Sequence, residues 1–435
     1  MRRVARVVAL VVAALLAVLS IMVWVPPFTL ALVALAIGAS EYSPLLVLFD
    51  LLWCLPVNRV LRATPRLRYA SLTVLILSAC LAVRPLTQYT RIAAAASEQL
   101  GTADLPPRFS LMAAFTGLPT SADVTERIVP YAAPDGERLT MRLYSLPQRE
   151  VRPAVVVLYG GAWQQGTSAQ ASNVSRALAS KGYVVAAMDY RHAPAARFPS
   201  QVADVRRGML LLRDSADAWG IDLARMAILG RSSGGHLAEL AAYMPGAYPF
   251  RAVIAIYAPY DLVRGYSDLP SPDPLGVRAV LTSFIGGTLE ERVAEYRAAS
   301  PASYVRPGLP PTLLVFGGRD HLVKPEFNRG AARALRAARV PVVSVELPWA
   351  EHAFDLAPAG LGGQLAFNVI VDFLSVNVKL ARVAQGSVTR APESERRSGS
   401  YATELHGARG TNWTHASDSA MVFSVKSRVA RNRRM

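Results

Sequence analysis

The segment Gly230-Arg231-Ser232-Ser233-Gly234-Gly235 has the composition of a sharp turn that presents a nucleophile. It directly follows the apolar residues 226–229 and precedes a helical pattern that begins at His236. A strand that turns abruptly into a helix strains the corner residue and exposes its side chain, and small neighbours let the two elements pack closely. The backbone N–H groups at the start of such a helix attract an anion. The pattern therefore predicts that Ser232 is a nucleophile, although a Gly/Ser turn that only caps a helix would use similar residues.

A second glycine-rich turn, Gly160-Gly161-Ala162, follows the apolar stretch 154–159. Together the two turns resemble those of the α/β-hydrolases, in the carboxylesterase and lipase branch related to hormone-sensitive lipase and to bacterial esterases. In that family a His-Gly-Gly-Gly turn donates backbone N–H groups to the oxyanion, together with the N–H of the residue after the nucleophile. The resemblance implies that Gly161, Ala162 and Ser233 are the donors in this chain.

Two residues depart from the family pattern. Tyr159 stands where the family usually has His, and Ala162 stands where a third Gly is usual. Both changes keep the backbone donors, but they put the shape of the loop in question. A further match to the family, the segment 189–194 with the downstream Phe198-Pro199 and Asp204, is interpreted as scaffold.

In this family an acid and a histidine follow the serine along the chain, in the order Ser, Asp/Glu, His. The chain contains six histidines, which are His192, His236, His321, His352, His406 and His415. The first two precede the expected position of the acid, and the last two lie in a polar tail. This leaves His321 and His352, while His236 is expected to pack beside the turn.

The resemblance selects Asp320 and His352. Asp320 follows the predicted strand 312–316 and His352 follows the predicted strand 342–347, which are the places where the family keeps its acid and its histidine. Asp320 would hold the imidazole tautomer, and His352 would take the serine proton and pass it to the leaving alkoxide. Glu351, next to His352, is a competitor for the role of Asp320.

Between about residues 125 and 380, short branched apolar stretches alternate with longer amphipathic ones, which indicates an α/β fold with a mostly parallel sheet. The predicted strands are 127–131, 139–144, 154–159, 183–189, 226–230, 252–257, 312–316 and 342–347, and the predicted helices include 168–180, 200–219, 325–338 and 363–374. The resemblance covers the same stretch and implies the α/β-hydrolase fold, with helices on both faces of the sheet. Residues 261–300 are expected to form a cap over an acyl pocket.

The first 90 residues predict a membrane anchor of about three helices. Residues 7–25 carry no charge and follow three arginines, and further apolar stretches cover 28–57 and 69–83. A helix needs about 20 apolar residues to cross a bilayer. A cleaved signal peptide would also begin with a basic and then an apolar stretch, but the later apolar stretches favour retention of this segment.

The arginines predict the orientation of the anchor. The connection between the second and third apolar stretches contains Arg59, Arg62, Arg66 and Arg68. Positively charged loops stay cytoplasmic, so three crossings would leave everything after Arg84 on the extracytoplasmic side, whereas two helices within 28–57 would break that agreement. Glu41 and Asp50 mark either an intramembrane functional site or a turn and a bundle interior.

The chain is expected to consist of the anchor (1–90), a connector (91–124), a hydrolase domain (125–384) and a basic, disordered tail (385–435). Most of the net charge of +16 lies in the anchor and the tail. A nucleic-acid-binding protein should instead concentrate Lys and Arg on its folded surface, so nucleic acid is not an expected partner. The two cysteines, Cys54 and Cys80, both lie in the anchor, which excludes a disulfide framework or a cysteine-based zinc site.

These patterns predict a membrane-anchored serine hydrolase that cleaves small-molecule or lipid esters through an acyl-enzyme, with neither a metal nor an organic cofactor. Amide or peptide cleavage by the same residues is the alternative among enzymes. A noncatalytic, membrane-bound binding protein with the shell of a hydrolase is the alternative from another class. The acyl chain, the alcohol and the oligomeric state stay open.

Overall fold

The structure is a computed structural model that describes residues 2–102, 109–147, 150–170 and 172–379. The predicted tail at 385–435, with His406 and His415, lies outside the described residues. Residues 103–108 of the predicted connector lie outside them as well.

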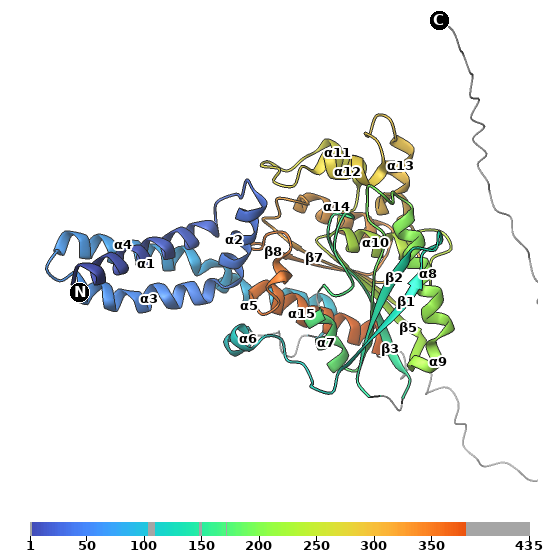
Figure 1. Cartoon of the computed structure of the whole chain (residues 1–435), viewed down its shortest axis with the longest axis horizontal. Coiled ribbons are helices and arrows are strands. Elements are labelled where there is room, and N and C mark those ends of the chain that lie inside the picture. The colour runs from blue at the N-terminus through green and yellow to red at the C-terminus, as the bar shows by residue number, and fades with distance from the viewer. Residues whose placement is uncertain (1, 103–108, 148–149, 171, 380–435) are drawn as a thin grey trace, which may run out of the picture. The chain divides into compact units, whose positions relative to one another are not determined.

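One eight-stranded sheet forms the centre of residues 125–379, which we call the sheet domain (Figure 1). The strands lie in the order β1-β2-β4-β3-β5-β6-β7-β8. Their bounds are β1 Thr125–Ala132, β2 Arg138–Ser145, β3 Arg152–Leu158, β4 Val184–Met188, β5 Ile221–Arg231, β6 Ala252–Ile256, β7 Thr312–Gly317 and β8 Val342–Leu347. β2 is antiparallel to β1 and β4, and the other neighbours are parallel. The predicted α/β architecture with a mostly parallel sheet is confirmed.

Helices cover both faces of the sheet, which explains why its central strands are almost continuously apolar. One face carries α5 (Arg84–Leu100), α7 (Ser172–Ser180) and α15 (Leu361–Leu374). The other face carries α8 (Ser200–Asp214), α10 (Ser233–Tyr243) and α14 (Pro325–Ala337). Short helices are α6 (Leu111–Thr116), α9 (Ala216–Trp219), η1 (Pro301–Tyr304), η2 (Phe354–Leu356) and η3 (Ser375–Lys379). The strands β4, β6 and β7 are therefore buried along their whole length.

Three α-helices, followed by η1, lie between β6 and β7, where the sequence predicts a cap. They are α11 (Leu262–Ser267), α12 (Val277–Ile285) and α13 (Val293–Ala298). Asp261 caps the N-terminus of α11, because its side chain accepts a hydrogen bond from the backbone N–H of Arg264. Phe284 of α12 is fully buried and stacks on Trp163 with ring centroids 4.2 Å apart, so α12 is packed onto the glycine-rich loop.

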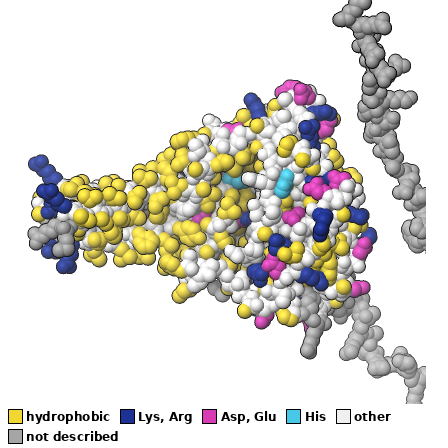
Figure 2. Space-filling model, in the orientation of Figure 1, with side chains coloured by type: hydrophobic (Ala, Val, Ile, Leu, Met, Phe, Trp, Pro, Cys, Tyr) yellow, Lys and Arg dark blue, Asp and Glu magenta, His cyan; other side chains and the backbone are white. Residues whose placement is uncertain are grey.

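The N-terminal segment forms α1 (Arg2–Met22), α2 (Leu30–Glu41), α3 (Ser43–Val60) and α4 (Pro65–Ala82). Within the described residues, four helical stretches are long and apolar enough to cross a membrane, namely Arg3–Met22, Ser43–Val60, Pro65–Leu100 and Leu361–Lys379. The last stretch is mostly buried inside the sheet domain, so its apolar character is explained by the core. Figure 2 shows hydrophobic side chains over most of the surface of α1, α3 and α4, with basic side chains at the far tip.

The apolar stretch 28–57 is not one helix. α2 ends at Glu41, and α3 begins at Ser43 with Pro44 in its first turn. A proline has no N–H to donate and disfavours helical geometry in the residue before it, so Pro44 favours a break between the two helices at this point. α2 is consequently a separate helix of 12 residues, too short to cross a bilayer.

Asp50 lies in the interior of the helical bundle. Its carboxylate accepts a hydrogen bond from the Ser20 hydroxyl at 3.4 Å, and its side chain is fully buried between α1 and α3. On the opposite end of the segment, the helix α5 runs across the predicted boundary at residue 90 and packs on α15 and β8.

Candidate active site

Ser232 occupies the corner between β5 and α10. Its φ of 51° and ψ of −124° lie outside the regions that L residues usually adopt. A Cβ on Gly230 would lie 2.0 Å from the carbonyl oxygen of Gly234, and one on Gly234 would lie 2.2 Å from the carbonyl oxygen of Tyr159. Only glycine fits at these two positions, and the close packing that results holds the strained turn in place.

The predicted serine, histidine and acid meet at the carboxyl ends of three strands. The Ser232 hydroxyl lies 3.0 Å from Nε2 of His352, and Nδ1–H of His352 donates to Oδ2 of Asp320 at 2.7 Å. The other carboxylate oxygen of Asp320 accepts from the backbone N–H groups of Leu322 and Val323, both at 2.8 Å. These bonds fix the carboxylate and, through it, the tautomer and orientation of the imidazole.

Glu351 does not take the place of Asp320 beside the imidazole. Its carboxylate accepts from the backbone N–H and from Nδ1–H of His321, at 2.7 and 2.6 Å, and from the backbone N–H of His352 at 3.1 Å. Glu351 therefore ties the loop of the acid to the loop of the histidine. The second candidate histidine, His321, is therefore bonded to Glu351.

The glycine-rich loop after β3 turns back on itself beside Ser232. Gly161 has a φ of 150°, and a Cβ on it would lie 1.9 Å from the carbonyl oxygen of Gln165, so this position requires glycine. Ala162, which departs from the family pattern, adopts a φ of 54° without the help of glycine. Ala162 and Ser233 line the same pocket as Ser232, and the N–H of Ser233 begins α10, where it has no acceptor within the helix.

Tyr159, the second departure from the family pattern, lies at the start of this loop and is held by contacts with Tyr190 and His192. Its ring stacks on Tyr190 with centroids 4.4 Å apart, and its hydroxyl donates to the carbonyl oxygen of Tyr190 at 3.1 Å. The same hydroxyl lies 2.8 Å from Nε2 of His192. Burial raises the pKa of Tyr159, so the phenol stays protonated and available as a donor.

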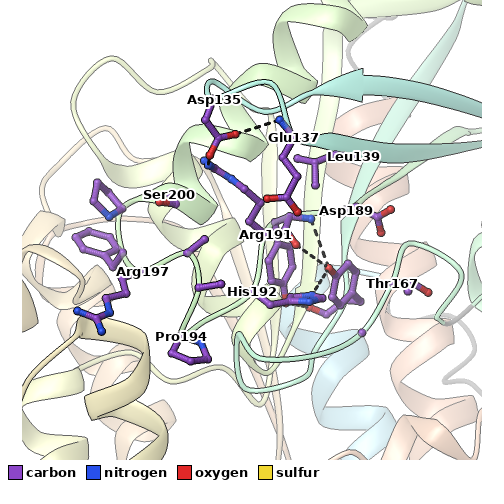
Figure 3. Close-up of a pocket in the computed structure, with 17 residues that line it drawn as sticks. Asp135, Glu137, Leu139, Thr167, Asp189, Arg191, His192, Pro194, Arg197 and Ser200 are labelled. Atoms are coloured by element: carbon purple, nitrogen blue, oxygen red, sulfur yellow. Dashed lines mark hydrogen bonds and ion pairs between the residues drawn. The ribbon is translucent and has the colours of Figure 1, made fainter.

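Tyr159 also lines a polar cleft of about 870 Å³, of which Ser232 is not part (Figure 3). The segment that was interpreted as scaffold lines it. Arg191 is ion-paired with Asp204 and Asp135, and Asp189 accepts hydrogen bonds from two backbone N–H groups at 2.5 and 3.2 Å. Arg191 is thus ion-paired, Asp189 is hydrogen-bonded to the backbone, and neither Ser232 nor His352 lines the cleft; the interpretation of this segment as scaffold stays a prediction.

Three buried residues that the sequence did not single out, Arg231, Tyr257 and Asp355, lie next to the serine and the histidine. Asp355 accepts from the Arg231 guanidinium and from the Tyr257 hydroxyl, and the Tyr257 ring lies 4.5 Å from the His352 ring. Burial, together with the charge of Asp355, raises the pKa of Tyr257 well above 10, so the phenol remains a donor. Arg231 lies inside the recognised turn and Asp355 three residues after His352, but nothing local indicates that they pair.

His236 links the glycine-rich loop to the cap. Its Nδ1 accepts from the indole N–H of Trp163 at 3.2 Å, and its Nε2–H donates to the carbonyl oxygen of Ala299 at 2.6 Å. Burial lowers the pKa of His236 to about 4, which keeps the ring neutral in this position. Both ring nitrogens are therefore engaged away from Ser232.

The pocket in front of Ser232 is apolar. Besides Ser232, His352 and the charged Asp261, its lining is mostly apolar and comes from the glycine-rich loop, the cap, the loop of the acid and α14; it includes Trp163, Leu262, Pro270, Leu275, Val277, Leu281, Leu322, Val323 and Phe327. The pocket encloses about 50 Å³, and its apolar surface suits the part of a hydrocarbon chain that lies next to the nucleophile. Among the described residues, no three His, Cys, Asp or Glu side chains lie close enough together to hold a metal ion.

Known proteins resemble this chain in the same region. A family model described as BD-FAE matches residues 141–335, which include Ser232 and Asp320. Esterase LipC of Mycobacterium tuberculosis is 31% identical over 255 residues, which are 54% of this chain and 61% of that protein. Probable carboxylic ester hydrolase LipM of the same organism is 31% identical over 231 residues, 50% of this chain and 53% of that protein. The chain thus spans little more than half the length of these mycobacterial relatives.

Ethyl acetate hydrolase of Pseudomonas putida is 31% identical over 265 residues, which are 58% of this chain and 77% of that protein. Two solved structures share the fold. An esterase from Pyrobaculum calidifontis matches with a TM-score of 0.52 and 24% identity over 67% of this chain and 92% of its own. A bacterial heroin esterase matches with a TM-score of 0.53 and 24% identity over 61% of this chain and 89% of its own.

Proposed function

The chain belongs to the carboxylesterase branch of the α/β-hydrolase family, and on this premise we propose that it is a membrane-anchored serine hydrolase that cleaves carboxylic esters. Its sequence relatives are named as esterases or ester hydrolases, which supports this class of reaction. The observation that carries the proposal is the continuous path of hydrogen bonds from Ser232 through His352 to Asp320.

Acylation would start at the Ser232 hydroxyl. Nε2 of His352 accepts the hydroxyl proton while Oγ attacks the ester carbonyl, and the negative charge of Asp320 stabilises the imidazolium that forms. The backbone N–H groups of Gly161, Ala162 and Ser233 would donate to the oxyanion of the tetrahedral intermediate. The imidazolium then gives its proton to the leaving alkoxide, which departs as an alcohol and leaves the acyl group on Oγ.

Deacylation would repeat these steps with water. His352 takes a proton from a water molecule, the hydroxide attacks the acyl carbon, and the proton returns to Ser232 Oγ as the carboxylic acid leaves. The apolar pocket that contains Trp163 and Leu281 would hold the acyl chain. The two steps together consume one ester and one water molecule and release one alcohol and one carboxylic acid.

The decisive experiment measures hydrolysis of p-nitrophenyl esters of graded chain length by the purified full chain in detergent. We expect turnover by the native protein and a loss of at least about 10⁴-fold in kcat for Ser232→Ala. Ser303→Ala, which removes an exposed hydroxyl in η1 far from the path, is the matched control and should keep full activity. A fluorophosphonate probe should label the native protein and not Ser232→Ala; an unlabelled native protein would identify a noncatalytic shell and reject the proposal.

The anchor is proposed to cross the membrane three times, through α1, α3 and α4. Each of these helices belongs to a stretch of sufficient length and apolarity. Arg3 and Arg6 lie at the start of α1, and Arg62 and Arg66 lie around the connection from α3 to α4. Since positive charge stays cytoplasmic, the tip of the bundle that contains the start of α1 and the connection from α3 to α4 is assigned to the cytoplasm, and the sheet domain to the extracytoplasmic side.

Labelling in intact cells tests this orientation. Val293→Cys places a thiol on exposed α13, and Cys54→Ser and Cys80→Ser remove the native thiols. The cysteine at 293 should react with a membrane-impermeant maleimide before lysis, whereas Arg62→Cys in the same background should react only after lysis. The reverse pattern would show that the sheet domain is cytoplasmic.

A further inference from the structure

The inner face of α2 packs on the two loops that carry Asp320 and His352. Val33 and Ile37 of α2 form a buried apolar cluster with Ala357, and Leu322 and Ala353 pack against this cluster. Leu322 follows Asp320 by two residues, and Ala353 directly follows His352. A helix of the N-terminal segment therefore supports the acid and the base of the site at the same time.

The C-terminal end of α2 is held at a second point. Oε2 of Glu41 accepts hydrogen bonds from the backbone N–H groups of Gly362 and Gly363, at 2.5 and 3.2 Å. These groups belong to the first turn of α15, where free N–H groups and the helix dipole favour a carboxylate. A Cβ on Gly362 would lie 2.7 Å from the Glu41 carboxylate, so the glycine permits the close approach. The contact fixes α2 in one rotation about its own axis.

That rotation turns an apolar surface outwards. Phe28, just before α2, and Leu30 and Leu35 within it are 67%, 52% and 38% exposed, and Ala31 and Ala34 are exposed beside them. No charged residue occurs from Phe28 to Ser40. A helix with one face packed and the other apolar and free is typical of a segment that lies on a membrane surface.

The helices that flank α2 in the sequence indicate that lipid covers its exposed apolar face. The chain enters α2 from α1 and leaves it into α3, and both flanking helices are long and apolar enough to cross a membrane. Trp24 lies at this end of the bundle, where its indole N–H donates to the carbonyl oxygen of Leu81 and the Arg84 guanidinium lies 4.7 Å from its ring. Tryptophan and arginine at the end of an apolar helix mark the level of the lipid headgroups.

We propose that α2 lies in the plane of the membrane surface with its outer face in lipid, and that it supplies the site with apolar acyl esters resident in the membrane. This inference rests on the esterase function proposed above and names its substrate class. The link between membrane and site is Leu322, which belongs both to the wall of the acyl pocket and to the surface that packs on α2.

The test compares one ester dissolved in the bilayer with one dissolved in water. The full chain is reconstituted in phosphatidylcholine vesicles and supplied with 4-methylumbelliferyl oleate in the bilayer or p-nitrophenyl acetate in the buffer. The variant Leu30→Gln/Leu35→Gln makes the outer face of α2 polar and leaves α1, α3 and α4 intact, so the protein stays in the membrane. We expect turnover of the oleate ester to fall about tenfold and turnover of the acetate ester to stay unchanged.

Leu210→Gln/Val293→Gln is the matched control, because these apolar side chains are 40% and 39% exposed but lie on α8 and α13 of the sheet domain. It should leave both rates unchanged. If Leu30→Gln/Leu35→Gln keeps the oleate rate, or lowers both rates equally, the inference is wrong. If the native protein cleaves neither ester, or Ser232→Ala cleaves both, the esterase function fails instead, and the labelling experiment below decides the position of α2 by itself.

Labelling measures the depth of α2 directly. Leu35→Cys, in a background with Cys54→Ser and Cys80→Ser, is labelled with an NBD fluorophore and placed in vesicles that contain brominated phosphatidylcholine. The label at 35 should be quenched strongly, and a label on Leu210→Cys should not. An NBD label at 35 that reports an apolar environment without quenching by the brominated lipid would mean that protein, such as a second copy of the chain, covers α2, and this would overturn the proposal.

Discussion

Nη1 of Arg231 donates a hydrogen bond of 2.9 Å to Oδ2 of Asp355, and this contact joins the residue before the nucleophile to the segment after His352. Both side chains are buried. The hydroxyl of Tyr257 donates to the other carboxylate oxygen, so strand β6 is joined to the same group. The distance between Ser232 and His352 thus depends on an ion pair that takes no part in proton transfer.

Asp355→Asn should therefore lower both stability and turnover. Removing one partner of a buried ion pair leaves the Arg231 charge unbalanced and costs about 3 kcal/mol or more. We expect a clear fall in Tm of the full chain in detergent and a fall in kcat larger than the change in KM, because the histidine loop is no longer aligned. Asp214→Asn breaks the exposed pair with Arg213 and is the control, with an expected effect of about 0–1 kcal/mol. Equal Tm values for the two variants would show that the Arg231–Asp355 ion pair does not stabilise the fold beside the site.

Asp320→Asn and Glu351→Gln separate the two carboxylates beside the histidine. An amide at 320 donates to Nδ1 of His352 and imposes the tautomer in which Nε2 carries the proton, so Nε2 cannot accept from Ser232. We expect kcat on p-nitrophenyl butyrate to fall by about 10⁴-fold. Glu351→Gln keeps an acceptor for the backbone of His321 and should cost less than about tenfold. The opposite ranking would make Glu351 the orienting acid.

Gly161→Ala should disable the glycine-rich loop. A Cβ at this position collides with the carbonyl oxygen of Gln165, so the loop must move and its N–H groups lose their aim at the oxyanion. The loss of such donors lowers kcat by about 10²-fold or more. Gly308→Ala is the control, since Gly308 also has a positive φ of 82° but open space around it. Kinetics of both variants on p-nitrophenyl butyrate check the prediction, which requires kcat to fall only for Gly161→Ala.

His236 should make the protein sensitive to mild acid. Its pKa is about 4 in the folded chain and near 6.5 when unfolded, so the unfolded state binds more protons between these values. The stabilisation is complete above about pH 6.5 and is lost as the pH falls towards 4. In His236→Gln, which does not titrate, the Tm difference from the native chain should be largest at neutral pH and shrink towards pH 4. A difference that is constant across this range would refute the assignment.

Much of the fold was predictable because the signals are local. The predicted strand 342–347 is β8, and the predicted helices 325–338 and 363–374 differ from α14 and α15 by one or two residues. Each is bounded by proline, glycine or a change from branched to polar residues. Strand β5 begins five residues earlier than predicted, because its first residues pair with Arg152 and Pro153 of β3 across a register shift. A pairing partner is not visible in the strand's own sequence.

Two other differences concern the place where a helix is broken. The predicted helix 200–219 is divided at Ser215 into α8 and α9, although no glycine or proline marks the break. The apolar stretch 28–57 is divided at Tyr42, where Pro44 was a visible signal that the apolar pattern outweighed. Hydrophobicity alone does not distinguish a helix that crosses a membrane from one that lies along a protein surface.

The sequence by itself determined the turn at Ser232 and the glycine-rich loop, because a strained corner and a run of glycines are written in neighbouring residues, whereas Asp320 and His352 were selected by the resemblance to a family. Only the tertiary structure decided that Asp320, and not Glu351, contacts the imidazole, and that Arg231 meets Asp355 across 124 positions of chain. Side chains from different loops point where the packing of adjacent strand ends directs them. That direction is a property of the assembled sheet, which no local stretch of sequence contains.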